Sequence, residues 1–138
     1  AGQKVVFTNG CFDILHIGHV DYLEKAQQLG HKLVLGLNTD SSIKRLKGEK
    51  RPIVTEYARA RVMASLSFVD LVVLFDEDTP LCLIEAVQPD ILVKGDDYTI
   101  DTIVGANFVI KHGGRVQTVA LVKGFSTSAL IDKIKAEG

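Results

Sequence analysis

Apolar and polar positions along this chain alternate between two spacings, one typical of strands and one typical of helices. Five short apolar runs have the length of buried strands, and each is followed by a polar segment and then by a helical pattern. The predicted strands cover Lys4–Thr8, Lys32–Leu37, Leu71–Phe75, Ile91–Lys94 and Val116–Val122.

The first helical pattern is a stripe formed by Val20, Leu23, Ala26 and Leu29, with Gly30 after it as a stop signal. Capping residues and glycines delimit the later helices. These are predicted over Glu56–Phe68, from Pro80 to Val87 with Thr79 as the cap, over Asp101–His112 before Gly113, and over Ser128–Ala136 with Ser126 or Thr127 as the cap.

Strand and helix therefore alternate five times, which predicts a parallel sheet covered by helices on both faces. We expect a single α/β domain over residues 1–138, a Rossmann-like three-layer α/β/α fold with a five-stranded parallel sheet. Ligands of such sheets bind beyond the carboxyl ends of the strands, where the strand order reverses. Four of the five segments that follow the strands are rich in Gly, Ser, Thr, Lys or Asp, which suits an anionic ligand.

Composition narrows the classes of function. The chain has 138 residues, 46% hydrophobic residues and a formal net charge of −1, as expected of a globular domain rather than a general nucleic-acid binder. It contains no apolar run near the ~18–20 residues that span a bilayer and begins with no signal-peptide pattern. We expect a cytoplasmic protein that binds neither membranes nor nucleic acid.

The two cysteines, Cys11 and Cys82, give neither a disulfide framework nor a zinc-ligand spacing. Cys11 stands beside the segment richest in candidate chemistry, so a nucleophilic role has to be considered. A small packed thiol is the better expectation.

That segment contains His16, Gly18 and His19 in the tetrapeptide HIGH, at a predicted helix start. Histidines three residues apart can project to the same side of a helix, and a helix start offers free N–H groups to phosphate. Such imidazoles can donate hydrogen bonds to phosphate oxygens and stabilise charge in a transition state. Two ordinary helix histidines are one alternative. A zinc site is another, but hydrolytic zinc motifs space their histidines differently and no third ligand is evident.

The pattern N-G-x-F-D-x-L-H-x-G-H between a strand and a helix resembles the cytidylyltransferase-like family of nucleotidyltransferases. GFSTS at residues 124–128 is similar to that family's second signature before the last helix. Asn38–Asp40 and Arg59 also stand where the family has them. The resemblance spans essentially the whole chain, and it implies transfer of a nucleotidyl group with release of pyrophosphate.

Within the family, the segments VFTNGCFDILHIGHVDYLEKAQQLG, RLKGEKRP, DEDTP and LVKGDDY resemble the adenylyltransferases that act on D-glycero-β-D-manno-heptose 1-phosphate for lipopolysaccharide synthesis. The nearest rival is the glycerol-3-phosphate cytidylyltransferase branch, which has an arginine where this chain has Leu121. The segment KGDDY does not discriminate between the two branches, because Lys94 resembles the heptose branch and Asp96 resembles the rival. A nucleotide-binding regulatory module without catalysis is the third hypothesis.

The resemblance implies roles for individual residues. His16 and His19 would hold the triphosphate and stabilise the transition state, and Lys47, rather than Lys44, would reach the phosphates as a catalytic group. Asp13 could be structural, metal-related or in contact with the sugar. The nucleotide site would comprise Thr8, Asn9, Gly10, Cys11, Phe12, Gly18, Asp40, Lys44, Arg59, Gly124, Ser126 and Thr127, and the sugar would bind near Asp13, Lys94 and Asp96.

The resemblance also implies Mg²⁺ carried with ATP, and no metal held by a protein cage. Two further expectations follow from it: a homodimer, and fusion to a sugar kinase or action after one. No covalent nucleotidyl-enzyme intermediate is expected, because the sequence contains no evident activated nucleophile.

Overall fold

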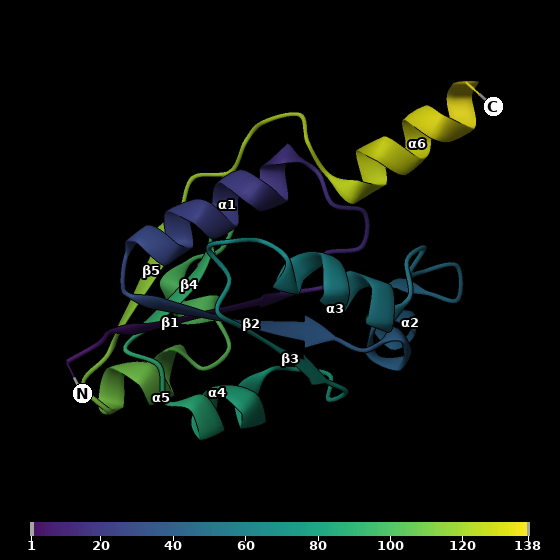
Figure 1. Cartoon of the computed structure of the whole chain (residues 1–138). Helices are drawn as coiled ribbons and strands as arrows, with labels where there is room; N and C mark the ends of the chain where they lie inside the picture. Colours follow the sequence, from purple (N-terminus) through teal and green to yellow (C-terminus); the bar gives the residue numbers. More distant parts are fainter. Residues whose placement is uncertain (1, 138) are drawn as a thin grey trace.

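The computed structural model describes residues 2–137, which build one five-stranded sheet with helices around it (Figure 1). The strands are β1 Val5–Gly10, β2 Lys32–Asn38, β3 Leu71–Phe75, β4 Ile91–Gly95 and β5 Arg115–Val119. The helices are α1 Ile17–Gln28, α2 Asp40–Lys47, α3 Glu56–Ala64, α4 Leu81–Val87, α5 Ala106–Lys111 and α6 Thr127–Glu137, with a 3₁₀ turn η1 at Ile100–Thr102.

The strands lie in the order β3-β2-β1-β4-β5, and all neighbouring strands are parallel. The chain moves outward from β1 to β3 and then returns to the other side of β1 for β4 and β5. The strand order therefore reverses between β1 and β4, and a ligand is expected at their carboxyl ends. The predicted Rossmann-like α/β/α fold is confirmed.

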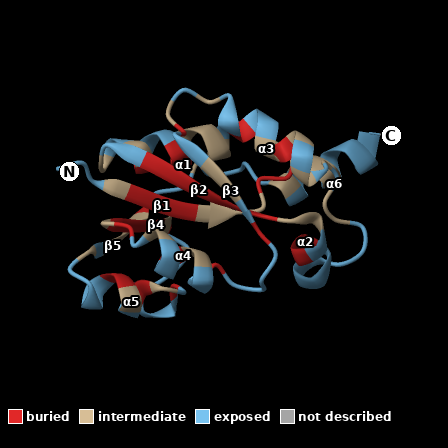
Figure 2. Cartoon of the chain, turned by 60° about the horizontal axis from the view of Figure 1, so that its bottom comes forward, coloured by how far each residue is buried: buried red, intermediate tan, exposed pale blue. Residues whose placement is uncertain are grey.

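Helices cover both faces of the sheet (Figure 1). On one face, Leu23 and Ala26 of α1 and Met63 of α3 pack on the strands, and on the other face Ile84 of α4 and Val109 of α5 do so. Figure 2 shows the buried residues along the strands and on the inward sides of the helices. This two-sided burial explains why the strands are continuous apolar runs.

Helix α6 is arranged differently. It projects away from the sheet and its flanking helices (Figure 1), and none of its residues is buried. Only its first turn reaches the carboxyl end of the sheet. Among residues 2–137, no helix combines the length and the hydropathy needed to cross a bilayer.

Two boundaries differ from the prediction near the site. The segment after β2 was expected to be a loop, but residues 40–47 form α2, whose N-cap Thr39 accepts a hydrogen bond from the Ser42 amide. Only Ile43 is a buried apolar residue in this helix, so helical periodicity was too weak to indicate it. The helix α3 ends at Ala64 rather than Phe68, and the Ser65 hydroxyl donates to the Val62 carbonyl at its end.

Three further predictions were wrong in detail. The helix expected over Asp101–His112 is divided into η1 and α5, because Gly105 lies between them with a φ of 88°. Pro80, not Thr79, is the N-cap of α4, and no side chain caps it. The last strand is Arg115–Val119, so it ends three residues earlier than the expected Val122.

Candidate active site

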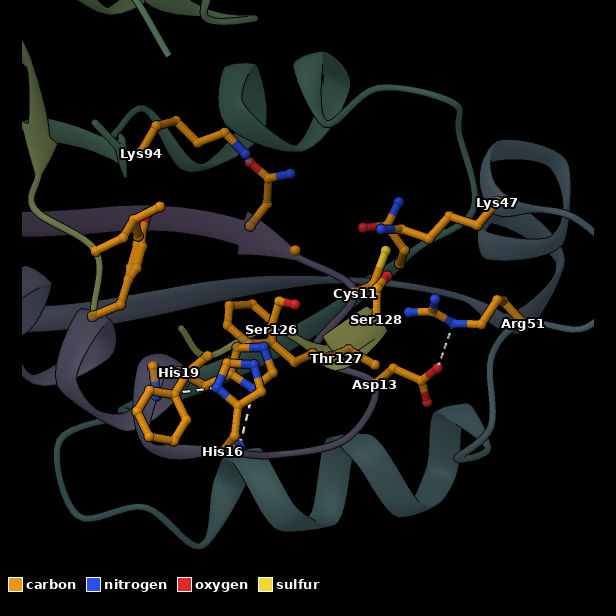
Figure 3. A pocket seen from close by; sticks show the side chains of 18 of the residues that line it. Cys11, Asp13, His16, His19, Lys47, Arg51, Lys94, Ser126, Thr127 and Ser128 are labelled. Carbon is orange, nitrogen blue, oxygen red and sulfur yellow. Dashed lines mark hydrogen bonds and ion pairs between the residues drawn. The ribbon is translucent and has the colours of Figure 1, made fainter. Parts of the chain in front are cut away.

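A cavity of about 530 Å³ opens at the carboxyl end of the sheet, beside the β1 and β4 ends where the strand order reverses. The loop after β1, the end of α2, the end of β4 and the start of α6 all contribute to its wall (Figure 3). It brings together these predicted site residues: Asn9, Gly10, Cys11, Phe12, Asp13, His16, Gly18, His19, Lys47, Lys94, Ser126 and Thr127.

His16 and His19 form a stacked pair at the start of α1. Their ring centroids are 3.8 Å apart and the ring planes meet at 27°. His16 is the N-cap of the helix: its Nδ1 accepts a hydrogen bond of 3.0 Å from the Gly18 amide. Its own amide donates to Nδ1 of His19 at 3.4 Å. The two rings therefore cap the helix reciprocally, as Ser and Glu do in a capping box.

This capping fixes the protonation of both rings. A nitrogen that accepts a hydrogen bond carries no proton, so each neutral ring holds its proton on Nε2. Burial lowers the pKa of His16, and the pKa of His19 is lowered to about 4 by burial and by His16, against an opposing effect of Asp13. At neutral pH both residues, which line the cavity, are uncharged Nε2–H donors.

Two glycines make room for the aromatic rings in this loop. A Cβ atom at Gly18 would lie 2.8 Å from Cε1 of His16, and one at Gly10 would lie 2.7 Å from Cε2 of Phe12. Phe12 is nearly buried, has a φ of +47° and places its ring edge-on to His19, with centroids 5.0 Å apart. The HIGH loop therefore depends on glycine at both positions.

Three cationic side chains enter the cavity from two sides (Figure 3). Lys47, the last residue of α2, and Arg51 of the next loop reach in from one side, and Lys94 at the end of β4 lies on the other. Lys94 contacts the Asn9 side-chain oxygen at 3.4 Å, and its ammonium group lies 4.9 Å from the Tyr98 ring centroid. Burial lowers the pKa of Lys94, while Asp97 and Cys11 act against that effect.

The first turn of α6 forms a further part of the wall. The Ser126 hydroxyl accepts a hydrogen bond of 3.0 Å from the Ala129 amide, so Ser126 caps this helix, as expected for one of the two candidates. Ser126, Thr127 and Ser128 line the cavity. Free amides and hydroxyls at a helix start attract phosphate.

Arg59 was predicted to support a phosphate or the lysine loop. It lies outside the cavity lining, only 1% of it is exposed, and it bonds to the two ends of the segment that carries Lys47. Its guanidinium donates to the carbonyl oxygens of Val54, Cys11 and Asn38 at 2.8–2.9 Å. It also pairs at 2.9 Å with Asp40, a predicted nucleotide contact that does not line the cavity. Arg59 ties the β1 and β2 ends to the loop that precedes α3.

Four other predicted residues do not line the cavity. Thr8 is fully buried, and its hydroxyl is bonded to the Tyr22 hydroxyl at 2.6 Å. Lys44, Asp96 and Gly124 are exposed. Lys44 and Lys47 are three residues apart on α2, and only Lys47 reaches the cavity, as the sequence analysis preferred.

Several lining residues were not predicted. They include Arg51, Asn38, Asp78 and Leu121. Arg51 could have been found, since it stands in the RLKGEKRP segment beside Lys47. Asn38 and Asp78 also stand in segments that resemble the family, Asn38–Asp40 and DEDTP, but those resemblances did not indicate which residues reach the cavity.

The cavity holds few groups for a metal or for covalent chemistry. Within residues 2–137, no cluster of three or more His, Cys, Asp or Glu side chains is arranged to hold a metal ion. The lining carboxylates are Asp13, whose side chain is 1% exposed, and Asp78, whose side chain pairs with Arg45. Burial raises the pKa of the Cys11 thiol, despite the opposing charges of Lys47, Arg59 and Arg51. A thiol in this state is a poor nucleophile.

Comparison with known proteins identifies the family of this chain. The family model described as Cytidylyltransferase-like matches residues 7–132. The bifunctional protein HldE of Magnetococcus marinus is 60% identical over 136 residues, which are 99% of this chain and 28% of the relative. HldE of Citrifermentans bemidjiense is 61% identical over 133 residues, 96% of this chain and 27% of the relative. The chain thus spans just over a quarter of the length of these curated relatives.

Solved structures show the same fold. The lipopolysaccharide core biosynthesis protein of Thermoplasma volcanium aligns with a TM-score of 0.70 and 32% identity, over 90% of this chain and 100% of that one. Pantothenate synthetase of Thermus thermophilus aligns with a TM-score of 0.61 at 17% identity, over 86% of this chain and 56% of that one, which is a likeness of fold alone. The motifs, the strand order, the HIGH cavity and the family match lead to one conclusion: this chain belongs to the Cytidylyltransferase-like family.

Proposed function

We propose that this chain transfers AMP from ATP to the phosphate of a heptose 1-phosphate and releases pyrophosphate. An oxygen of the acceptor phosphate attacks the α-phosphorus of ATP, and the bond from that phosphorus to the bridging oxygen of the β-phosphate breaks. The single observation that carries the proposal is the His16–His19 pair, two neutral donors in one cavity with three cations.

The role of the histidines follows from their protonation. Negative charge grows on the oxygens around the α-phosphorus during attack, and preorganised donors stabilise that charge. The Nε2–H groups of His16 and His19 are held by their capping bonds before any substrate arrives. Because the rings are neutral, they donate hydrogen bonds without holding the product by a full charge.

The cations and α6 would bind the other anionic groups. Phosphoryl-type transfer needs in-line positioning and neutralisation more than covalent help. Lys47 lies on one side of the cavity and Lys94 on the other, with the first turn of α6 as a further anion-binding element. We assign Ser126 and Thr127 to the β- and γ-phosphates, with Lys47 as the lysine that neutralises the reacting phosphates.

We propose that ATP enters with Mg²⁺, which would neutralise phosphate charge when bound. The donor set fits an ion held by phosphates and water rather than by protein, since the carboxylate of Asp13 is enclosed and Asp78 is shared with Arg45. Of the two lining carboxylates, the exposed Asp78 rather than the enclosed Asp13 would contact the ion.

Two observations support heptose 1-phosphate as the acceptor. Leu121 lines the cavity where the glycerol-3-phosphate branch has an arginine, and RLKGEKRP and Lys94 resemble the heptose branch. Relatives of 59–61% identity carry the name bifunctional protein HldE, and a solved relative is a lipopolysaccharide core biosynthesis protein. We accordingly propose fusion to a sugar kinase, or action after one, and a cytoplasmic location where ATP is available.

We also propose a homodimer. The edge strand β3 exposes Leu71 and Leu74, by 53% and 40%, and an unpaired apolar edge is a site for association. Sedimentation equilibrium would test this, and a monomer mass at all micromolar concentrations would refute it.

The function is tested by measuring pyrophosphate release with ATP and CTP, each against heptose 1-phosphate and glycerol 3-phosphate. We expect ATP with heptose 1-phosphate to give the highest kcat/KM. CTP with glycerol 3-phosphate as the best pair would favour the rival branch. Binding of ATP without turnover on any acceptor would favour the regulatory module.

A further inference from the structure

Arg51 and Asp13 form an ion pair at the cavity that neither the motifs nor the proposed roles explain. Arg51 lies in the loop between α2 and α3, and Asp13 lies in the loop after β1. The guanidinium Nε contacts Oδ2 of Asp13 at 3.0 Å, and the two side chains are 15% and 1% exposed. Figure 3 shows this contact on the side of the cavity where Lys47 also enters.

Both oxygens of the Asp13 carboxylate accept hydrogen bonds from the loop between α2 and α3. Its Oδ1 accepts hydrogen bonds from the amides of Ile53 and Val54 at 3.0 and 2.8 Å, and its Oδ2 accepts from Ile53 at 2.9 Å as well as from Arg51. Burial raises the pKa of Asp13, but the amides of Ile53 and Val54 and the Arg51 charge outweigh that effect, so its pKa is lowered. Asp13 is thus an anion that fastens residues 51–54 to the HIGH loop.

Arg51, unlike Asp13, keeps hydrogen-bonding groups without a protein partner in the part of the chain that the structure describes. Only its Nε is engaged: among residues 2–137, no protein group accepts a hydrogen bond from its two Nη atoms. The side chain lines the cavity together with Lys47. A guanidinium presents its donors as a rigid fork that matches two oxygens of one phosphate, and it stays protonated at any physiological pH.

We propose that Arg51 binds a phosphate group of a substrate through its Nη donors, and that Asp13 is the positioning residue that aims it. A contact of Asp13 with the sugar was one of the roles implied by the family resemblance. Its enclosed carboxylate assigns it instead to the loop. The phosphate belongs either to the triphosphate of ATP or to the acceptor, and this inference rests on the proposed transfer reaction for its kinetic readout.

The test compares Arg51→Met with Lys50→Met, a change of the same charge at an exposed residue of the same loop that does not line the cavity. Arg51→Met should raise the KM of one substrate by about 10–100-fold, the loss expected for a hydrogen-bonded charged group. A rise for ATP identifies the triphosphate, and a rise for the heptose phosphate identifies the acceptor. Lys50→Met should change neither KM by more than about twofold.

Asp13→Asn tests the positioning role. It should raise the same KM as Arg51→Met, and the double variant should lose no more than Arg51→Met alone, because both changes remove one interaction. Additive losses would show that Asp13 acts independently of Arg51. If circular dichroism and thermal melting show that Asp13→Asn does not fold, Arg51→Lys is measured in its place. We expect its KM to lie between that of wild type and that of Arg51→Met.

The role of Arg51 and the proposed transfer reaction would be refuted by different results. An active Arg51→Met variant with both KM values within twofold of wild type overturns the role of Arg51. Wild-type protein without turnover overturns the proposed function instead. In that case calorimetric titration of wild type and Arg51→Met with ATP and pyrophosphate still decides whether Arg51 binds phosphate.

Discussion

The amide of His16 donates a hydrogen bond to Nδ1 of His19, while Nδ1 of His16 accepts one from Gly18, so each ring is locked by the backbone of the same helix turn. The side chains proposed to act on the substrate are thus also the ones that start α1. Function and folding are therefore coupled at these two residues, and variants must be chosen to separate them.

His16→Asn provides that separation. Asparagine is among the best N-cap residues, so this variant should unfold with nearly the wild-type free energy. It should lose about 2–4 kcal/mol of transition-state stabilisation because the Nε2 donor is gone. His16→Ala should lose the same activity and about 1 kcal/mol of stability in addition. Urea unfolding and initial rates measure both quantities. Wild-type kcat in a folded His16→Asn variant would contradict the catalytic role.

The pKa of His19 predicts how stability depends on pH. Its folded pKa of about 4 lies below the ordinary value of 6.5, so the unfolded chain binds the proton more readily. The free energy of unfolding should thus fall as pH decreases from about 6.5 to about 4, by on the order of 1–2 kcal/mol after solvent screening.

Urea unfolding at pH 7 and pH 4.5, in wild type and His19→Asn, measures this contribution. The variant should show a smaller loss between the two pH values. His112→Asn is the control, because His112 is exposed at the end of α5. Equal losses in wild type and His19→Asn would mean that His19 is not held neutral.

Gly18→Ala should impair catalysis through His16. The added Cβ would lie 2.8 Å from the His16 ring, so the ring must move from its place above His19. We expect kcat to fall at least tenfold with a smaller change in the KM for ATP. One misplaced hydrogen-bond donor is enough to lower kcat by this factor. Ile17→Ala, at a neighbour that is 51% exposed, should stay near wild type. A kcat within twofold for Gly18→Ala would argue against a fixed position of the His16 ring.

Arg59→Met should destabilise the protein strongly. Four acceptors lose their partner when this buried guanidinium is removed, and leaving such groups unpaired costs about 3–5 kcal/mol. Arg61→Met changes an exposed arginine of the same helix and should cost less than about 1 kcal/mol. Thermal melting compares them. Similar melting temperatures would show that the Arg59 bonds contribute little.

Much of the fold was readable because the apolar pattern is strong where the sheet is buried. The prediction for Leu71–Phe75 had the bounds of β3 itself, and the HIGH segment starts α1 as expected. Errors occur where one residue outweighs periodicity: Gly105 divides the expected helix over 101–112, and Thr39 starts a helix with a single buried apolar residue.

Site residues could be predicted where their contacts lie within one sequence motif. His16, His19 and Ser126 each lie at a helix start and line the cavity, and their local sequence context predicted these positions. The burial of Arg59 and the Asp13–Arg51 pair depend on segments about 40 residues apart meeting beneath the cavity. No spacing within one motif encodes such a meeting, so the sequence could not decide whether Arg59 supports a phosphate or the lysine loop, and Arg51 was missed.

The separation of α6 from the body of the protein has a consequence for chains still being synthesised. All five strands and every residue of the two buried core clusters are synthesised before residue 120. Ser126 and Thr127 emerge only afterwards, on a helix that adds no buried residue to that core. Within residues 2–137, the part of the cavity wall that Ser126 and Thr127 form is thus synthesised after every residue of the buried core, and it can be altered without removing a core contact.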